Sequence, residues 1–569
     1  TGTVVGAEDD EPLVGATVMP IGGGTGTATN IDGKFTLTLP ANVKELKVSY
    51  VGMHAATVPA SDGMTVKLVN STNRLDEVMV VAYGTVKKSE YTGAASVVNS
   101  EQLQDALVTT VTSALSGKVS GVQTLSSNGQ PGVAPTVRIR GVGSINANSN
   151  PLYVVDGLPF EGDINQLNPQ DIESMTVLKD AASTALYGAR GANGVILVTT
   201  KQGHRDGDVK VTFDARWGAN HRALPNYDVV TDTDQYLKMV GQAIYNNARY
   251  VNGVSGASAL NSANANLWKS LGYQIYTIPT GENFFLNENF DINPNATLGY
   301  TDGKYYYTPD DWIDETFRAG FRQEYNLSLQ GSSDKINYYL SAGYLGNDGL
   351  IEGSHFKRFS TRLNVDYQMK PWLKVGANMS YVYTNSGYPG DQDTDAGSSS
   401  GNAFFLAYQM GPVYPMYLRS ADGNIIYDKA TGNPVYDYGS KDYDAHGLSR
   451  NFMSGANPVS ALLYNTEEYL TDFFNGKWYA TVTPIAGLNV TGTLGYTTNN
   501  ERLHYLQTPL YGQSSTYGGQ VVQQASNGST LSLQALASYS RTFNDVHNMD
   551  LMAGYESLER HSEYVEAAG

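Results

Sequence analysis

Residues 168–201 read NPQDIESMTVLKDAASTALYGARGANGVILVTTK, and this stretch decides the fold. Residues 172–178 predict a strand, residues 179–187 predict one short helix, and residues 195–199 predict a second strand. Gly188 and Gly191 allow the tight exit from the helix, because glycine tolerates the left-handed backbone of a helix end. The stretch therefore predicts strand, helix and strand in a compact α+β unit.

The glycines at 188, 191 and 194 resemble a phosphate-binding loop only in their spacing. A dinucleotide fingerprint needs glycines that follow a strand and open a helix, whereas these glycines end one. The sequence also contains no His-Glu-x-x-His zinc motif and no Walker loop. Carboxylate pairs can be drawn among 55 acidic residues, but sequence separation does not give their distance in space. We predict that the chain is not an enzyme.

The composition suits a large β structure. The chain has 569 residues with Gly 60, Tyr 40 and Cys 0, a mixture typical of a barrel with aromatic girdles and tight turns. A net charge of −18 without a Lys/Arg cluster argues against a nucleic-acid partner. No stretch approaches the ~20 apolar residues of a spanning helix, so we expect any membrane crossing to use strands. Mean hydropathy is −0.31, as alternating strands allow.

Both ends of the sequence are abrupt. Residues 1–5 read TGTVV, like the middle of a strand, so we expect that a signal peptide and a few residues precede them. Residues 563–569 offer no barrel-closing strand. We expect a partial chain.

Residues 1–70 predict a small all-β module. A strand at 13–18 and a strand at 34–39 flank Asn30-Ile31-Asp32-Gly33, and Asp-Gly between strands is a hairpin signal. With residues 26–29 and 49–52, the module resembles the carboxypeptidase regulatory-like domain, which implies a seven-stranded sandwich. No residue pattern in it suits zinc binding or hydrolysis.

A linker over residues 71–90 contains an apolar, β-prone run after an acidic start: Leu75, Asp76, Glu77, Val78, Met79, Val80, Val81, Ala82, Tyr83 and Gly84. An extended segment of this kind suits pairing with the sheet edge of another protein, and an ordinary buried strand is the alternative. The run resembles the TonB box of SusC-like transporters, which implies that TonB of the inner-membrane TonB–ExbB–ExbD complex binds it.

The unit over residues 91–203 resembles the plug domain of SusC-like TonB-dependent outer-membrane transporters, and residues 168–201 carry the resemblance. The rest of it predicts a helix at 108–115 and strands at 119–124, 136–140 and 152–157. The resemblance implies a transmembrane antiparallel β-barrel, of about 22 strands when complete, with this α+β plug inside it.

Residues 204–569 predict the first part of that barrel. Nine segments alternate apolar and polar residues, and the clearest, 373–383, places Leu, Val, Ala, Met, Tyr and Tyr on one face. The others are 209–217, 321–329, 336–344, 359–367, 474–482, 488–496, 531–539 and 549–555. The connections alternate between long and short, as extracellular loops and periplasmic turns of an outer-membrane barrel do.

Three groups of residues are candidate sites. Arg138 and Arg140 lie on a plug strand, so we expect them to pair with wall carboxylates, with a moving gate contact as the alternative. The long loops are rich in aromatics, and Trp312, Phe404, Phe405 and Tyr408 are candidate ligand contacts, although loop packing is the commoner role. Asp391, Asp393 and Asp395 alternate as in a calcium loop, but no Glu stands at its twelfth position, and a solvated loop tip is the alternative. No other cofactor is expected.

The resemblance implies TonB-dependent import of oligosaccharides across the outer membrane of a Gram-negative, Bacteroidetes-like bacterium. It also implies a SusD-like lipoprotein over the barrel, in a two-plus-two assembly. Oligopeptide import and a siderophore or vitamin receptor are the alternatives. A signalling receptor usually carries an N-terminal βαβ domain, and an adhesin needs neither plug nor TonB box, so both fit poorly.

Overall fold

The computed structural model describes residues 1–7, 11–21, 26–39, 43–50, 53, 56–68, 78–81, 84–87, 95–104, 110–126, 129–143, 149–160, 162–180, 184–203, 209–223, 225, 227–389, 402–543 and 547–569. The chain divides into two units, Thr1–Ala94 and Ala95–Gly569. Among the described residues, no helix combines the length and the apolar character that crossing a bilayer requires.

The first unit contains two small sheets. One has the strand order β4-β1-β7 and the other β3-β2-β5-β6. The strands are β1 (Gly2–Gly6), β2 (Thr17–Pro20), β3 (Thr27–Ala28), β4 (Lys34–Phe35), β5 (Glu45–Ser49), β6 (Ala56–Pro59) and β7 (Met64–Leu68). Alternate residues such as Val4, Val18 and Val48 are fully buried in one core, which is the expected pattern for strands that face a core on one side. Further along, β8 (Val78–Val81) and β9 (Gly84–Lys87) pair as an antiparallel hairpin.

The second unit begins with the α+β plug. Its main sheet has the order β10-β15-β16-β13-β14, and β11 pairs with β12. The elements are β10 (Ala95–Asn99), α1 (Ser100–Gln104), η1 (Ser113–Leu115), β11 (Val122–Leu125), β12 (Thr136–Ile139), β13 (Leu152–Val155), β14 (Leu158–Pro159), η2 (Ile164–Gln166), η3 (Pro169–Asp171), β15 (Ile172–Leu178), η4 (Ala185–Gly191) and β16 (Val195–Thr200). The stretch that opens the sequence analysis thus supplies two neighbouring strands, β15 and β16.

The predicted helix over 179–187 takes another form. The described residues hold a 3₁₀ segment, η4, that is broken at Gly188, where φ is +58°. A left-handed residue interrupts regular helical hydrogen bonding, and glycine adopts it without a steric penalty. The two glycines that were expected to end a helix therefore shape a kinked connection between β15 and β16.

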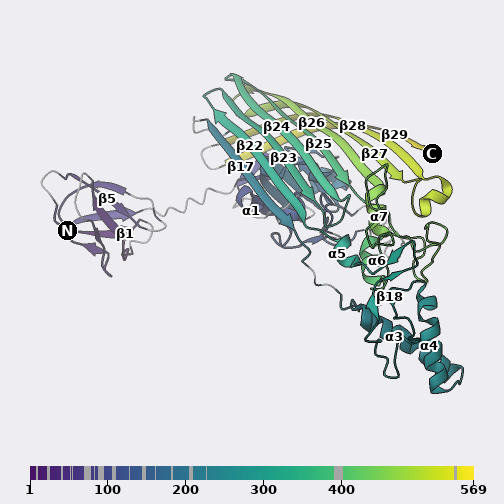
Figure 1. The fold of residues 1–569 in the computed structure, drawn as a ribbon. Coiled ribbons are helices and arrows are strands. Elements are labelled where there is room, and N and C mark those ends of the chain that lie inside the picture. The colour runs from purple at the N-terminus through teal and green to yellow at the C-terminus, as the bar shows by residue number, and fades with distance from the viewer. Residues whose placement is uncertain are drawn as a thin grey trace. The chain divides into compact units, whose positions relative to one another are not determined.

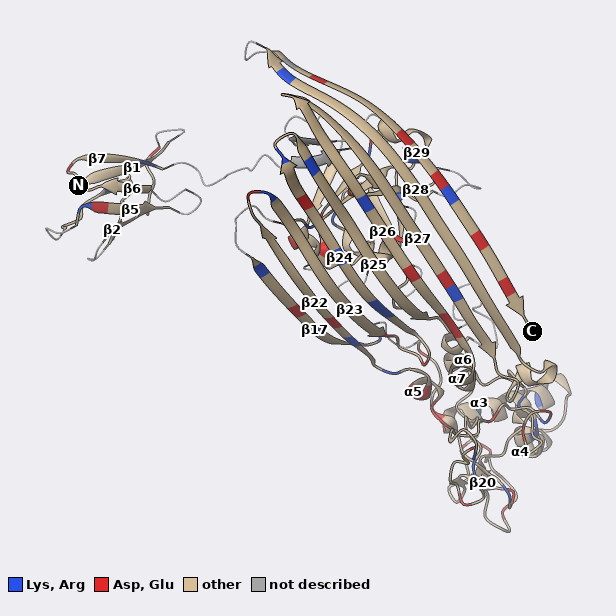
Figure 2. Cartoon of the chain, turned by 90° about the horizontal axis from the view of Figure 1, so that it is seen from above, with Lys and Arg blue, Asp and Glu red and all other residues tan. Residues whose placement is uncertain are grey.

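The wall is a nine-stranded antiparallel sheet in sequential order. Its strands are β17 (Lys210–Asn220), β22 (Gly320–Ser332), β23 (Ile336–Asp348), β24 (His355–Lys370), β25 (Leu373–Gly387), β26 (Thr466–Ile485), β27 (Leu488–Gln507), β28 (Gln520–Phe543) and β29 (His547–Ala568). Figure 2 shows that charged residues form only isolated bands along these strands. The mainly β fold with an α+β plug, predicted from the sequence, is confirmed.

The later wall strands are longer than predicted. Strands β26 to β29 have 20 to 24 residues each, and β27 pairs with β28 without interruption from Leu488 to Gln507. The predicted long connection 498–529 therefore shrinks to residues 508–519. A membrane crossing needs only about 9–11 residues of a tilted strand, so these strands extend beyond one membrane thickness.

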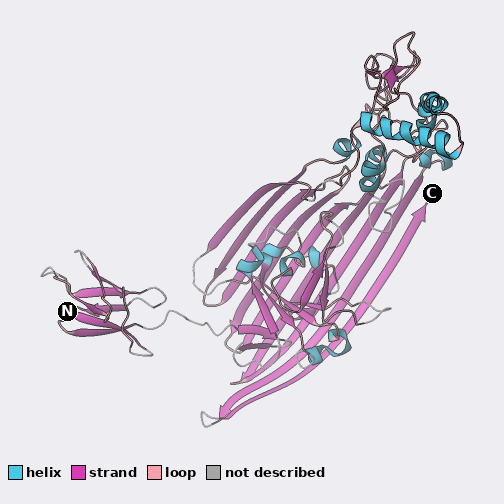
Figure 3. Cartoon of the chain, turned by 90° about the horizontal axis from the view of Figure 1, so that it is seen from below, coloured by secondary structure: helices cyan, strands magenta, loops and turns pink. Residues whose placement is uncertain are grey.

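The long connections gather at one end of the sheet, where the helices α3 to α7 lie together (Figures 1 and 3). This loop region contains α3 (Thr233–Asn246), η5 (Asn247–Val251), α4 (Gly256–Leu271), β18 (Tyr276–Thr277), β19 (Thr297–Leu298), β20 (Tyr300–Thr301), β21 (Tyr306–Tyr307), α5 (Trp312–Thr316), α6 (Ala403–Gln409), α7 (Pro458–Tyr464) and η6 (Gln513–Tyr517). It encloses its own apolar core, in which about half of the buried residues are aromatic.

Candidate functional site

The plug contacts one face of the wall, and Figure 3 shows it lying against the sheet. Strand β24 alternates between that face and the opposite one: Arg358, Ser360, Arg362 and Asn364 are buried, whereas Lys357 and Phe359 are exposed. The period-two alternation that predicted the strand therefore also divides it into a plug-facing side and an outer side.

Arg358 binds a turn of the plug. Its guanidinium donates to the carbonyl oxygens of Leu167 (3.2 Å) and Asn165 (3.4 Å) and to Oδ1 of Asn168 (3.3 Å). Asn168 in turn donates to Oδ1 of Asn326 on β22 at 2.9 Å. Because charge-assisted hydrogen bonds to fixed backbone acceptors are strong and directional, Arg358 fixes this turn against the wall.

Arg362 lies four residues further along β24, between two plug carboxylates. Its nitrogens are 3.7 Å from Asp156 and 3.8 Å from Asp171. Asp156 also accepts hydrogen bonds from the backbone and hydroxyl of Thr200, and Asp171 accepts one from Tyr339 on β23 at 2.9 Å. Here the wall contributes the cation and the plug contributes the anions.

The remaining described contacts between plug and wall are largely polar. Asn364 donates to Thr200 Oγ1 at 2.9 Å, Gln166 donates to Asn499 at 3.0 Å, and Lys477 donates to the carbonyl oxygen of Asp156. Among the described residues, only Val382 and Phe473 of the wall join the buried apolar core of the plug. The plug therefore has a core of its own, and a polar surface connects it to the wall.

The aromatics of the loop region are mostly core residues. Trp312 is 3% exposed, and its Nε1 donates to the carbonyl oxygen of Tyr414 at 3.0 Å. Phe405 packs against the same core, Phe404 is 40% exposed beside Phe317, and Tyr408 lies 4.9 Å from the Arg222 guanidinium. Of the four candidate ligand contacts, Phe404 thus has the most accessible ring by these measures.

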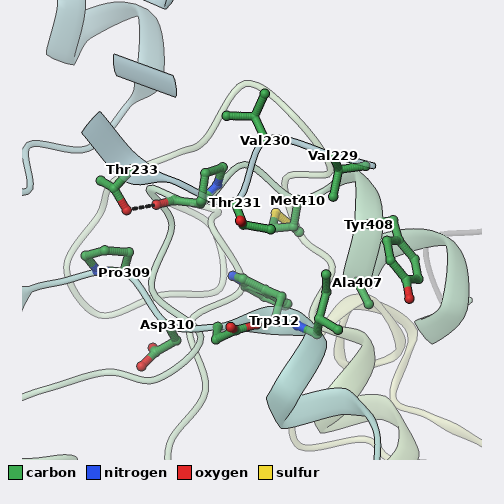
Figure 4. Close-up of a pocket in the computed structure, with 13 residues that line it drawn as sticks. Val229, Val230, Thr231, Thr233, Pro309, Asp310, Trp312, Ala407, Tyr408 and Met410 are labelled. Atoms are coloured by element: carbon green, nitrogen blue, oxygen red, sulfur yellow. Dashed lines mark hydrogen bonds between the residues drawn. The ribbon is translucent and has the colours of Figure 1, made fainter. Parts of the chain in front are cut away.

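A cavity of about 190 Å³ lies between α5, α6 and the segment that leads into α3 (Figure 4). Figure 4 shows Trp312, Met410 and Thr231 around the same space, with Tyr408 at one side. Asp310 on its rim already binds Arg419 at 3.0 Å and the backbone nitrogen of Met416 at 2.7 Å. A volume this small holds one side chain or one ring rather than an oligomer.

Three potential metal ligands meet in the loop core, namely Asp437, Asp444 and His446. The hydrogen bonds argue against a metal there. His446 Nδ1 accepts from the backbone nitrogen of Leu448 at 2.9 Å, so the ring proton lies on Nε2, 3.1 Å from Asp437 Oδ2. A metal on Nε2 would need a lone pair that this tautomer does not have.

The same cluster carries an unbalanced charge. The carboxylates of Asp437 and Asp444 share one cation, the guanidinium of Arg450. Arg450 is fully buried and lies 3.7 Å from Asp437. Burial, followed by the Asp437 carboxylate, raises the pKa of Asp444 to about 6. Burial and the same two carboxylates raise the pKa of the Tyr273 hydroxyl, which donates to Asp437 at 2.8 Å. The network therefore favours the uptake of one proton by Asp444.

Comparison with known proteins identifies the family. Residues 87–195 match the TonB-dependent Receptor Plug Domain, and residues 1–80 match the CarboxypepD_reg-like domain. The chain is 30% identical to TonB-dependent receptor P3 of Formosa agariphila, covering 98% of this chain and 47% of that protein. It is 29% identical to TonB-dependent receptor SusC of Bacteroides thetaiotaomicron, covering 81% and 40%. The structure of the RagAB peptide importer in its open-open state matches with 26% identity and a TM-score of 0.64, covering 86% and 50%.

The chain belongs to the SusC-like TonB-dependent receptors. It spans about half the length of the curated relatives it matches.

The predicted TonB-binding segment of this SusC-like receptor lies partly outside the described residues. Val78–Val81 forms β8 and Gly84 opens β9, while 71–77, 82 and 83 are not described. The acidic loop with Asp391, Asp393 and Asp395 lies wholly outside the described residues. TonB binding and calcium binding at these places stay predictions.

The two plug arginines of this SusC-like receptor bond within the plug. Arg138 Nη1 donates to Asn150 at 3.0 Å, and Arg140 Nε donates to the carbonyl oxygen of Lys179 at 2.6 Å. Arg140 has a φ of +65°, so its backbone is strained as well. Their pairing with wall carboxylates stays a prediction, because neither bond reaches the nine wall strands of this chain.

Sequence reasoning missed the wall arginines. Arg362 lies in the predicted strand 359–367 and Arg358 directly precedes it, and a charge on the inner face of a plugged barrel needs a partner. That signal was available in the segment 359–367, which includes Arg362, but it did not name the partners.

Proposed function

We propose that this SusC-like receptor imports oligosaccharides across the outer membrane of a Gram-negative, Bacteroidetes-like bacterium. The observation that carries the import proposal is the largely polar contact between the plug and the wall. Polar interfaces of this kind separate more readily than a continuous apolar core. The family is one of receptors and transporters, and we propose no catalytic step.

The energy for import would come from the inner membrane. The sequence contains no Walker loop, and the segment 75–84 lies in the linker just before the plug. A TonB protein that pairs with this segment by strand addition could pull on β10, the edge strand of the plug sheet. A SusD-like lipoprotein over the loop region, in a two-plus-two assembly, completes the proposal.

Deletion of residues 75–84 tests the energy source. We expect uptake to cease while binding of substrate at the cell surface persists, since the loop region and plug are untouched. Uptake by the deletion variant at the level of the intact receptor would contradict the TonB proposal. Removal of residues 1–70 is the control, and we expect a smaller loss.

Oligopeptides are the second candidate cargo, favoured by the likeness to the RagAB peptide importer. Native mass spectrometry of the receptor, extracted in mild detergent from its own membrane, separates the two. A bound mass ladder in hexose steps supports oligosaccharides, and amino-acid steps support peptides. Absence of a co-purifying lipoprotein would count against the SusD-like partner.

A further inference from the structure

Arg358 and Arg362 occupy the same face of β24 but are held very differently. Arg358 donates to three acceptors that belong to one plug turn. Arg362 has two carboxylates beyond hydrogen-bond distance, at 3.7 and 3.8 Å, and its Nε has no hydrogen-bond acceptor. Both side chains are nearly fully buried, at 3% and 4% exposure.

Two polar atoms near Arg362 also lack a hydrogen-bond partner. Ser380 is its direct partner on β25, and Asn364 lies two residues along on the same face. Ser380 Oγ and Asn364 Oδ1 are buried without a hydrogen-bond partner. Asn364 Nδ2 nevertheless donates to Thr200 Oγ1 at 2.9 Å and to the carbonyl oxygen of Lys201 at 2.6 Å, so the loose contact with the plug is confined to the Arg362 guanidinium itself.

The two carboxylates come from separate parts of the plug. Asp156 lies in the turn between β13 and β14, and Asp171 ends the 3₁₀ turn before β15. Each has another partner that it keeps without Arg362: Thr200 within the plug for Asp156, and Tyr339 on the wall for Asp171. The guanidinium can therefore move toward either carboxylate without leaving the other with no partner.

We propose that Arg362 is a positioning residue that holds the plug at rest by sharing its charge between Asp156 and Asp171, and that this shared contact yields first when the plug moves. Arg358 then acts as the fixed anchor. The proposal rests on the import function proposed above, and it adds a named wall residue that sets the resting position of the plug.

The test measures spontaneous opening of the complete receptor in planar lipid bilayers, without substrate and without TonB. We expect Arg362→Gln to raise the frequency of ion-conducting openings about tenfold, as the loss of a weak buried ion contact implies. Arg362→Lys keeps the charge and should restore most of the resting state. Arg502→Gln is the matched control, because Arg502 pairs with Asp472 on a neighbouring wall strand and is about half exposed.

A double-mutant cycle with Asp171→Asn separates positioning from general stability. If Arg362 acts through Asp171, the double variant opens less often than the product of the two single effects predicts. The proposal would be overturned if the opening frequency of the double variant equals the product of the two single effects. It would also be overturned if Arg362→Gln opens no more often than the unchanged receptor, or if Arg502→Gln opens as often as Arg362→Gln. No uptake is measured, so a failure here is distinct from a failure of the import function.

Discussion

Removal of the Arg450 side-chain charge should loosen the loop core. Arg450 is fully buried, lies 3.7 Å from Asp437, and donates to the carbonyl oxygens of Phe452, Met453 and Ala456. Arg450→Met keeps much of the volume but leaves two buried carboxylates without a cation. Breaking a buried pair in this way costs roughly 3–5 kcal/mol.

Native-state hydrogen exchange of the loop region in the complete receptor measures this cost. A loss of about 3 kcal/mol corresponds to exchange about a hundredfold faster at amides that open only when the core opens, such as those in the last turns of α4. Arg249→Met is the matched control, since Arg249 also donates to a carbonyl oxygen, that of Val254, but at the surface. Unchanged exchange in Arg450→Met, or an equal increase in Arg249→Met, would refute the reasoning. Adding Asp437→Asn to Arg450→Met should recover part of the loss.

Three further changes test other parts of the structure. The folded-state pKa of Asp444 is raised to about 6, so the stability that its protonated carboxyl contributes is fully present below about pH 4 and is lost as the pH rises through about 6. Protection factors of the loop-core amides, which are corrected for the base-catalysed pH dependence of exchange, should therefore be higher at pH 5 than at pH 8, and Asp444→Asn should reduce that difference. Gly272→Ala places a Cβ 1.9 Å from the backbone oxygen of Ser449 at a φ of +84°, whereas Gly281→Ala also has a positive φ but meets open space. Thermal unfolding should therefore show Gly272→Ala to be less stable than Gly281→Ala by about 1–2 kcal/mol. Phe473→Ala removes a buried ring, 5.2 Å from Phe160 of the plug, and should lower the calorimetric melting temperature more than Phe474→Ala on the opposite face, with a cost of roughly 3–5 kcal/mol; equal melting temperatures would contradict the packing.

The sequence was informative where the signal is local. Alternation in 373–383 predicted both the strand β25 and its two faces, and the structure buries the alternate set that includes Asn378 and Ser380. The Asp-Gly turn at 32–33 and the glycines after β15 likewise sit where the chain turns. Such signals are readable because each depends on neighbours a few residues away.

The sequence-based prediction fell short where the length of a strand or the contacts of a side chain depend on segments far away in the chain. The C-terminal part of β27, from Glu501 to Gln507, lacks a clear alternation of apolar and polar residues but pairs continuously with β28. Trp312, Phe404, Phe405 and Tyr408 stay candidate ligand contacts, but the loop core that buries Trp312 draws its residues from the connections that precede β22, β26 and β28. Local pattern does not show whether an aromatic ring in a long loop meets solvent or another loop.

The sequence by itself determined that this protein is a mainly β chain with an N-terminal β module, because period-two patterns and glycine turns act over short distances. The plug was predicted from the family resemblance of residues 168–201. Only the tertiary structure decided which charges hold the plug. Arg362 meets Asp156 and Asp171 across about two hundred residues of chain, and the partner of a buried charge depends on packing between distant segments, which no local pattern encodes.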